Sequence, residues 1–473
     1  MPLQKIVINN FNMGGVADSI FSGVKNSLAR IVGWDLHSVA GLLQVSQKMT
    51  KISGSTVTEL CKSRVDCSNG NKYWGSATTG KIWKQTSGDV FTLLTTIVPT
   101  SGSAAILSMR EHAGFVYITT ANYLHKIQVS DEAVTMNVQE LVNHASFHPM
   151  KTVNLMLYIG DGNDVHQINE SNTFTAEALD LPVGLTITSL GAGSTYLLIG
   201  AYLGAGINKA MIYRWNTWSA SFTNSDEVPE EGIWAFLEID NIILVYAGYS
   251  GNIYFYNNEG LEHFKRIAGT YSPTKKAIIH PDAVGILNGS IPLFGVSNVT
   301  GNPCDQGVWS LGRHSRNYPM VLSLPFPISD VDGDGYPVVA GVEIGSLIVS
   351  GTNVYISKSY NSGYGIEKLD YSNKIAKPFL ETRVMIPDSG ELTTFTRFVV
   401  GYAELPTGTS IVMKAKRNYG ASYDELTSKP DAIRMLQVSE DSRRDARALQ
   451  IRVEAVSSSN NAPSIDEVAL YVE

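Results

Sequence analysis

The chain has 473 residues, which is too many for one hydrophobic core and enough for two or three structural units. Hydrophobic residues make up 44% and charged residues only 17%, with 42 glycines and 22 tyrosines, a composition typical of an all-β protein rich in turns rather than of a helical enzyme. The net charge of −8 argues against a protein that coats nucleic acid by neutralising its phosphates.

Targeting signals and cross-links are not evident in the sequence. The start, Met1 to Lys5, lacks the long apolar stretch of a secretory signal peptide, and no run is apolar and long enough to span a membrane. The three cysteines fit neither a disulfide framework nor a CxxC metal site. We therefore expect free thiols in a protein made in a reducing cytosol, and no membrane partner.

Residues 1–60 form a non-repeating N-terminal arm. Ile6 to Ile8 is a candidate strand, and residues 34–45 return to extended structure. Between them, Asp18 stands as a helix cap before an apolar pattern with helical spacing. That pattern predicts a short helix lying on another surface, with an apolar stripe of Ile20, Phe21, Val24, Leu28, Ile31 and Val32.

Residues 61–376 repeat one unit, most clearly at Ile242 to Asn257. An apolar run ends near a glycine, a short loop follows, and the next run alternates apolar and polar residues, which indicates a β-hairpin. About seven copies recur at roughly 40 to 50 residues, the spacing of propeller blades. They are residues 73–84, 115–127, 157–168, 196–215, 242–257, 292–311 and 347–369.

This repeat predicts an all-β fold with a β-propeller of about seven blades. Strands packed between neighbouring blades should be continuously apolar, whereas half-exposed outer strands should alternate. Closing the ring leaves few open sheet edges without any need for helices. A large β-sandwich or a β-helix with irregular repeats is the alternative fold.

Residues 377–473 have a different sequence pattern, which predicts a C-terminal β-sandwich. Alternating strands are separated by turns rich in Pro, Gly, Ser and Asn. The expected strands are residues 379–385, 395–402, 410–416, 448–454 and 468–472. The last of them ends next to the chain terminus.

The arm resembles the N-termini of tailed-phage virion proteins. The resemblance rests on N-F-x-x-G-G-x-x-D-S at residues 10–19, on Asn26-Ser27, and on W-D-L-H-S-V-A-G-L-L-Q-V at residues 34–45. Ala40 stands where those proteins commonly have proline, so the match is inexact. The plan of arm, propeller and terminal β-domain is also similar to that of the tail hub or nozzle proteins of short-tailed phages.

This resemblance implies a structural, non-enzymatic protein of the virion tail that is synthesised in the host cytoplasm. Copies would form a ring, with six expected, around the DNA exit channel. The ring would bind neighbouring tail proteins on its portal or adaptor side and on its fibre side. Phage DNA would pass nearby without sequence-specific binding.

Three other functions remain open from the sequence: a receptor-binding virion protein, a propeller glycosidase or lyase, and a cellular propeller scaffold. A receptor-binding fibre or spike protein could recognise host surface glycans through a propeller face, although the chain has no long repetitive shaft. A propeller glycosidase would need carboxylates that meet only in space, and these cannot be identified from the sequence.

Asp330, Asp332 and Asp334 form the most specific local motif, D-V-D-G-D-G. Three carboxylates on alternate residues followed by glycine can supply oxygen ligands to one structural calcium ion, which is the only cofactor that the sequence suggests. The motif resembles EF-hand-like and integrin-type loops, but Gly341 stands at the twelfth position and Val338 where propeller loops often have aspartate. A solvated acidic turn is the alternative.

Two further patterns are not expected to carry chemistry. Residues 75–81 fit GxxxxGK, but Ile82 follows the lysine instead of Ser or Thr, and the context is a strand rather than a helix, so we expect a hairpin turn. The nine histidines show no metal-binding pair spacing. His112 and His125 flank one hairpin, His144 and His148 lie in a connection, and we expect each at the surface or in a turn.

Overall fold

A computed structural model shows an all-β protein. It describes residues 4–17, 19, 21, 23–141, 143, 145–193, 196–239, 242–257, 260–267, 276–299, 304–386, 393–420, 422–430, 435–437 and 444–472. Its one helix within these ranges is α1 (Phe11–Gly14). The chain divides into two compact units. The propeller unit comprises residues 51–306 and 341–368, and the terminal β unit comprises residues 1–50, 307–340 and 369–473.

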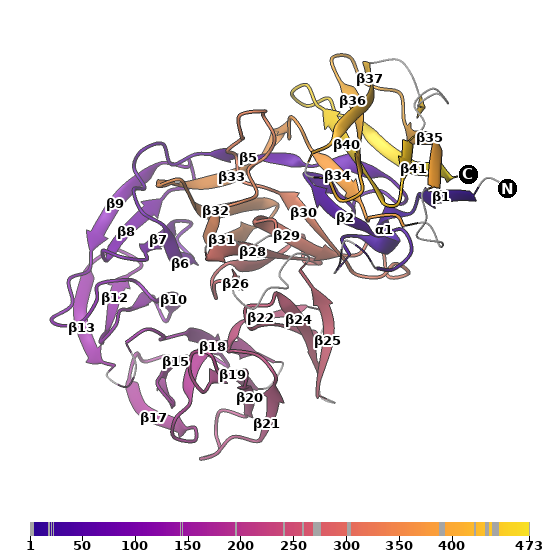
Figure 1. The fold of residues 1–473 in the computed structure, drawn as a ribbon. Coiled ribbons are helices and arrows are strands. Elements are labelled where there is room, and N and C mark those ends of the chain that lie inside the picture. The colour runs from indigo at the N-terminus through magenta and orange to yellow at the C-terminus, as the bar shows by residue number, and fades with distance from the viewer. Residues whose placement is uncertain are drawn as a thin grey trace. The chain divides into compact units, whose positions relative to one another are not determined.

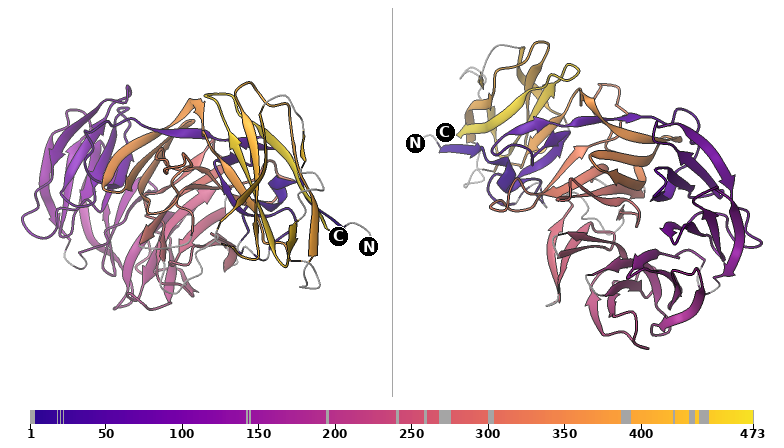
Figure 2. Two further views of the ribbon diagram at one scale, coloured as in Figure 1. Left: turned by 45° about the horizontal axis from the view of Figure 1, so that its top comes forward. Right: turned by 180° about the vertical axis from the view of Figure 1, so that it is seen from behind.

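The propeller unit consists of antiparallel sheets that follow one another around a ring (Figure 1). Figure 2 shows the same succession of sheets from two other directions. The first sheet consists of β6 (Cys61–Asp66), β7 (Lys72–Ser76), β8 (Lys81–Gln85) and β9 (Phe91–Thr96). The second consists of β10 (Ser108–His112), β11 (Phe115–Thr119), β12 (Tyr123–Gln128) and β13 (Val134–Glu140). The third consists of β14 (Met150–Val153), β15 (Met156–Asp161), β16 (Asp164–Ile168) and β17 (Phe174–Asp180).

The remaining sheets complete the ring. The fourth consists of β18 (Thr186–Ala192), β19 (Leu197–Tyr202), β20 (Ala210–Trp215) and β21 (Asn224–Val228), and the fifth of β22 (Ile233–Ile239), β23 (Ile242–Ala247), β24 (Asn252–Asn257) and β25 (Gly260–Arg266). In the sixth, β26 (Lys276–Ile278) and β27 (Val284–Leu287) both pair with β28 (Ile291–Val299). The seventh consists of β31 (Glu343–Ser350), β32 (Asn353–Tyr360), β33 (Gly363–Lys374) and β5 (Gln47–Lys51).

The innermost strands close into a ring of seven. Each contacts the next in the order β6, β10, β14, β18, β22, β27 and β31, and β31 contacts β6 again. The prediction of about seven blades is therefore confirmed for the part of the chain that the structure describes. Strand β5 is the fourth strand of the last blade. The two residues directly after it are also bound there, because the Ile52 N–H donates to the Ile366 carbonyl over 2.9 Å and the Ile366 N–H donates to Ser53 Oγ over 3.0 Å.

Five of the seven predicted hairpins are the second and third strands of their blades. The repeat at residues 347–369 instead starts on the first strand of its blade, β31, which pairs with β32, and the repeat at residues 292–311 falls on β28 and β29 (Gly307–Gly312). Strand β7 pairs with β8, β11 with β12, β15 with β16, β19 with β20 and β23 with β24. The second strands are the most deeply buried, because neighbouring blades cover both of their faces. At the closure of the ring, Trp74 and Trp83 of the first blade pack in one core with Ile348, Tyr355 and Ile366 of the last.

The terminal β unit contains two larger groups of strands. In the first group, β41 (Ser464–Val472) pairs with β1 (Gln4–Ile8), β4 (Leu43–Val45) and β35 (Thr393–Tyr402). Strand β4 also pairs with β3 (Trp34–Asp35). Strand β35 also pairs with β38 (Met435–Gln437) and β39 (Arg444–Ala446). In the other, the order is β29 (Gly307–Gly312), β30 (Val321–Phe326), β2 (Leu28–Val32), β34 (Phe379–Thr382), β40 (Leu449–Val456), β36 (Ser410–Arg417) and β37 (Asp424–Pro430).

Two sequence-based expectations differ from this unit. The helix expected after Asp18 is wrong for residues 28–32, which form β2 between β30 and β34. Leu28, Ala29, Ile31 and Val32 are buried, so the apolar positions belong to a strand covered on both faces rather than to a helix stripe. Asp18 and Ile20 lie outside the described residues.

The division of the chain also differs from the expected boundaries of 1–60, 61–376 and 377–473. The arm shares both strand groups with the C-terminal strands, and residues 307–340 join them. The strands expected within 377–473 are present, but they do not form a domain from that segment alone. A domain boundary inferred from local sequence pattern cannot reveal such shared sheets, because strand pairing joins segments that are distant in the sequence.

Candidate functional site: the central cavity of the propeller

A cavity of about 600 Å³ lies inside the ring of innermost strands. Its walls come from the starts of these strands and from the segments that precede them. That volume falls within the range of small-molecule sites in proteins. The innermost strands carry polar and charged residues among apolar ones because their inner edge faces this space rather than a neighbouring blade.

Three cationic side chains line the cavity from consecutive blades. Arg64 lies on β6, Arg110 on β10 and Lys151 on β14. The Arg110 guanidinium forms an ion pair with the buried Asp282 carboxylate, with 2.7 Å between Nη2 and Oδ1. Arg64 donates from Nε to the Leu347 carbonyl over 2.8 Å and from Nη2 to the Val284 carbonyl over 3.3 Å. Arg64 therefore has hydrogen-bond partners but no carboxylate in these contacts.

Lys151 differs from both arginines. Within the part of the chain that the structure describes, its ammonium group has neither a hydrogen bond nor an ion pair. Burial lowers the pKa of Lys151 to about 8, and the positive charges of Arg110 and Arg64 act in the same direction. The carboxylates of Glu238 and Asp282 oppose this shift without cancelling it. Burial also lowers the pKa of Arg64, against the opposing charge of Asp282.

A second group of charges at the cavity is balanced internally. The Glu343 carboxylate lies 2.9 Å from the Lys62 ammonium and 3.1 Å from His280 Nε2. Burial opposes its charged form, but the hydrogen bond from His280 and the charge of Lys62 lower the pKa of Glu343 to about 2. Lys62 and His280 line the cavity, so this side of it contributes little net charge.

Aromatic rings form another part of the wall. Phe147, Trp234 and Tyr249 line the cavity. The Trp234 ring centroid lies 6.1 Å from that of Phe147 and 5.0 Å from that of Tyr249, and the indole N–H donates to the Gly248 carbonyl over 2.9 Å. These contacts hold the rings in fixed positions, which gives the cavity apolar surface next to its charged groups.

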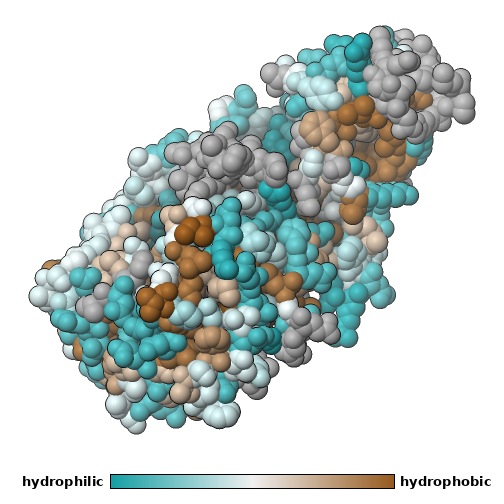
Figure 3. Space-filling model, turned by 60° about the horizontal axis from the view of Figure 1, so that its bottom comes forward, coloured by the Kyte–Doolittle hydropathy of each residue, from teal (hydrophilic) through white to brown (hydrophobic). Residues whose placement is uncertain are grey.

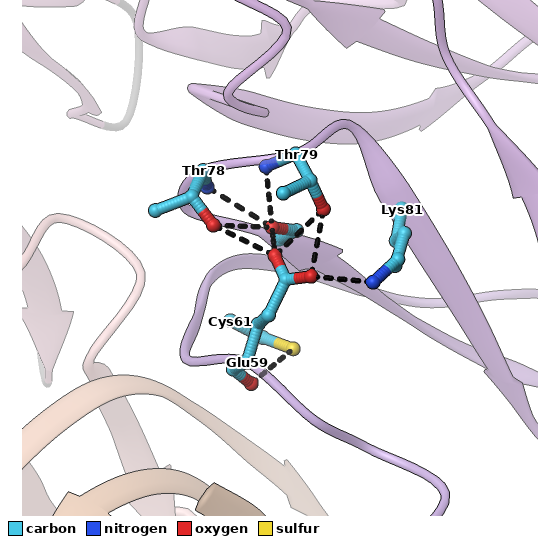
Figure 4. Close-up of polar contacts among 6 residues, drawn as sticks. Glu59, Cys61, Thr78, Thr79 and Lys81 are labelled. Carbon is cyan, nitrogen blue, oxygen red and sulfur yellow. Dashed lines mark hydrogen bonds and ion pairs between the residues drawn. The ribbon is translucent and has the colours of Figure 1, made fainter. Parts of the chain in front are cut away.

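The GxxxxGK segment is a hairpin turn between β7 and β8, as predicted. Its hydroxyl groups face the Glu59 carboxylate (Figure 4). Thr78 Oγ1 donates to Glu59 over 2.7 Å, Thr79 Oγ1 does so over 2.7 and 2.8 Å, and Lys81 Nζ lies 2.7 Å from the same carboxylate. Although burial works against the charge, these donors and Ser76 lower the pKa of Glu59 to about 2. The turn thus binds an anion supplied by the protein itself.

The acidic motif forms a turn in the terminal β unit. The Asp332 carboxylate accepts the N–H groups of Asp334 and Tyr336 over 3.0 and 2.9 Å, and the Val338 N–H donates to the Asp330 carbonyl over 3.0 Å. No group of three His, Cys, Asp or Glu side chains placed to hold a metal ion occurs among the described residues, these three aspartates included. Calcium binding by Asp330, Asp332 and Asp334 stays a prediction.

The expectation of surface positions is wrong for three of the four histidines named, and the fourth, His144, lies outside the described residues. His112, His125 and His148 are buried, and they hold backbone groups rather than facing solvent. His125 Nδ1 accepts the Asn137 N–H over 3.1 Å, and His148 Nε2 lies 3.0 Å from the Ala121 carbonyl. Asn137 has a φ of 54°, so His125 binds the backbone at a bulge between the two outer strands of its blade. All three cysteines are buried, and none of them forms a disulfide.

Arg64, Arg110, Lys151 and Asp282 are the residues that sequence reasoning missed. The signal was a basic residue on the strand ahead of the apolar strand in three consecutive repeats, spaced roughly one repeat apart.

No helix among the described residues is apolar and long enough to cross a membrane. On the face shown in Figure 3, hydrophobic residues gather in groups separated by hydrophilic ones.

Comparisons with known proteins support the fold and nothing finer. No family model matches the sequence, and no curated protein matches it. The solved structures that resemble the chain include a streptogramin B lyase (12% identity, TM-score 0.48, 69% of this chain and 98% of that chain) and an inactive virginiamycin B lyase from Staphylococcus aureus with quinupristin (14%, 0.49, 68% and 98%).

A third similar structure is the extracellular domain of a hybrid two-component system from B. thetaiotaomicron (14% identity, TM-score 0.50, 80% of this chain and 47% of that chain). At these identities the likeness concerns the fold alone. The chain is a β-propeller protein, and the resemblance of its arm to phage tail proteins stays a prediction.

Proposed function

We propose that this protein is a structural component of a phage virion tail, in the hub or nozzle. Copies would form a ring around the DNA exit channel and bind neighbouring tail proteins. The observation that carries the proposal is the construction of the terminal β unit from both ends of the chain. Strand β1 pairs with β41, and the segment that carries the phage resemblance, residues 34–45, supplies β3 and β4 of the same sheet.

This construction suits a subunit of a large assembly. The propeller is a closed, rigid block, and the terminal β unit is a second surface to which neighbours can bind. Interfaces of this kind bury about 800 Å² per partner and need exposed side chains rather than reactive ones. Large apolar side chains that are exposed on the propeller include Leu155, Val183 and Trp218, the last two being 95% and 83% exposed.

The cavity chemistry favours a structural or binding role over glycoside hydrolysis. Among the described residues that line the cavity, Asp282 is the only carboxylate, and it is paired with Arg110. Hydrolysis of a glycosidic bond ordinarily uses two carboxyl groups that flank the bond. We therefore propose that the protein is not an enzyme.

Purified virions test the proposed function. Mass spectrometry should detect this chain in particles, and an image reconstruction of the tail should show several copies around the central channel. The terminal β unit should contact at least one other tail protein. Virions that lack the chain, or tails in which it occurs as a single copy away from the channel, would overturn the proposal.

A further inference from the structure

We propose that the central cavity of the propeller binds a small anionic ligand through Lys151 and Arg64. The ligand would carry a phosphate or carboxylate group on a body the size of a monosaccharide. This site is independent of the proposed role in a virion, because it rests only on the cavity and its charges.

The first argument is the charge balance of the cavity wall. Arg110 is neutralised by Asp282, and Lys62 shares Glu343 with His280. Arg64 donates only to carbonyl groups in the contacts described above, and Lys151 has no hydrogen-bond or ion-pair partner among the described residues. Glu238 is the remaining carboxylate near Lys151, and its side chain is exposed to solvent. About two positive charges therefore face the cavity without a paired carboxylate.

The second argument is the loss of folding stability that comes from placing unpaired cations in the cavity wall. A cation withdrawn from water destabilises a fold unless an opposite charge or several acceptors compensate it. Lys151 is placed on an innermost strand next to two arginines, where each positive charge makes the others less favourable. An anion that enters the cavity would remove this penalty, and Lys151 and Arg64 would then hold it by charge-assisted hydrogen bonds.

The third argument concerns the body of the ligand. Phe147, Trp234 and Tyr249 give the cavity apolar surface beside the cations. Aromatic rings of this kind pack against the C–H face of a sugar or against another flat group. A volume of about 600 Å³ accommodates a monosaccharide with its anionic group.

Isothermal titration with the full-length chain at low ionic strength tests the proposal. The probes are inorganic phosphate, glucose 6-phosphate, glucuronate and neutral glucose. We expect saturable binding of at least one anion and none of glucose. Binding of the phosphates alone would identify a phosphate site, and binding of glucuronate alone a carboxylate site. Binding of glucose as tight as that of the anions, or no saturable binding of any anion, would overturn the proposal.

Two variants assign the binding to the cavity. Lys151→Met should weaken anion binding about tenfold or more, the loss typical of one charge-assisted hydrogen bond. Lys209→Met is the matched control, because Lys209 is an exposed lysine of the same unit, paired with Glu227 outside the cavity. Its affinity should equal that of the unmodified protein. Equal affinities of the unmodified protein and Lys151→Met would place any anion elsewhere and overturn the proposal.

A measurement on the unmodified protein keeps the test valid even where Lys151→Met fails to fold. Anion binding should be weaker at about pH 9.5 than at about pH 7, because the lysine pKa of about 8 lies between them. Lys151→Arg should remove this pH dependence and retain binding. Anion affinity that is the same at both pH values would contradict a contribution from Lys151.

Discussion

The hairpin turn at residues 75–81 and the central cavity both gather positive charge and hydrogen-bond donors, but they differ in what faces the donors. In the turn, Ser76, Thr78, Thr79 and Lys81 surround the Glu59 carboxylate. In the cavity, Lys151 has no hydrogen-bond or ion-pair partner within the described residues. The difference separates a cluster that stabilises the fold from one that suits a ligand. A motif that resembles a phosphate loop binds an internal carboxylate, whereas unremarkable basic residues in the repeats face an open cavity.

The largest expected effect is that of Glu59→Gln. The amide removes the charge that four donors share, so we expect the free energy of unfolding of the propeller to fall by about 2 kcal/mol, the cost typical of losing hydrogen bonds to a charged group. Urea unfolding followed by tryptophan fluorescence measures this change. Glu227→Gln, which removes an exposed carboxylate paired with Lys209, is the control and should change stability by less than about 0.5 kcal/mol. Equal effects of the two variants would contradict a structural role for the turn.

Acid should abolish the difference between the unmodified protein and Glu59→Gln. The pKa of Glu59 is lowered from 4.5 to about 2, so its contribution to stability is complete above about pH 4.5 and is lost as the pH falls towards 2. The two proteins should therefore converge in stability over that interval. Unfolding curves at a series of acidic pH values measure this. A constant difference down to pH 2 would show that Glu59 acts without its charge.

Lys151→Met, measured without ligand, is expected to raise the free energy of unfolding, whereas Glu59→Gln lowers it. Replacing an uncompensated cation by an apolar side chain of similar length should raise the free energy of unfolding by about 1 kcal/mol, because replacing buried charges by apolar groups is often stabilising. Thermal or urea unfolding in a buffer without multivalent anions measures the change. A loss of stability would mean that Lys151 already has a stabilising partner, and the contrast between the two sites would disappear.

Alkaline pH should reduce the stability that Lys151→Met gains over the unmodified protein. The pKa of Lys151 is lowered from 10.5 to about 8, so between these values the unfolded chain binds more protons than the folded one. The unmodified protein therefore gains stability as the pH rises from about 8 to 10.5, relative to Lys151→Met, which lacks the group. Comparing the two proteins at each pH removes the contribution of other titrating residues. A difference that is independent of pH would contradict the lowered pKa.

The smallest effect is expected for Thr79→Val. Thr79 is exposed and is one of several donors to Glu59, so its loss should cost about 0.5 kcal/mol, at the low end for one hydrogen bond. Thr92→Val on β9 is a matched control, because Thr92 is also exposed and its hydroxyl has no partner among the described residues. Urea unfolding should show a smaller change for this control. An equal change for both would mean that the hydroxyl contact with Glu59 adds nothing.

The sequence predicted the strands that are covered on both faces and missed those beside the cavity. Ile242 to Ala247 and Asn252 to Asn257 were evident, because packing between blades selects apolar runs ended by glycine. Strands such as Cys61–Asp66 were not predicted, because one edge packs in the blade and the other faces a polar space. The helix expected over residues 28–32 failed because a strand buried on both faces can also place apolar residues at helical spacing.

The candidate site was less accessible to sequence analysis than the fold. Arg64, Arg110 and Lys151 lie far apart in the chain, and only the closure of the ring brings them to one cavity. Asp282, which neutralises Arg110, comes from a blade near the end of the repeat. A spacing rule cannot distinguish the paired cation from the unpaired one, because pairing is decided across the ring.

The strand that completes the last blade also constrains how the protein is made. Ser53 leaves the ribosome early, but its partner Ile366 follows 313 residues later. Until then, β5 has no partner strand, and the apolar face of the first blade that packs against the last blade is uncovered; both favour association with other chains. Nascent protein should therefore depend on chaperones until translation has passed the last blade, and premature termination before it should give aggregates rather than a shortened propeller.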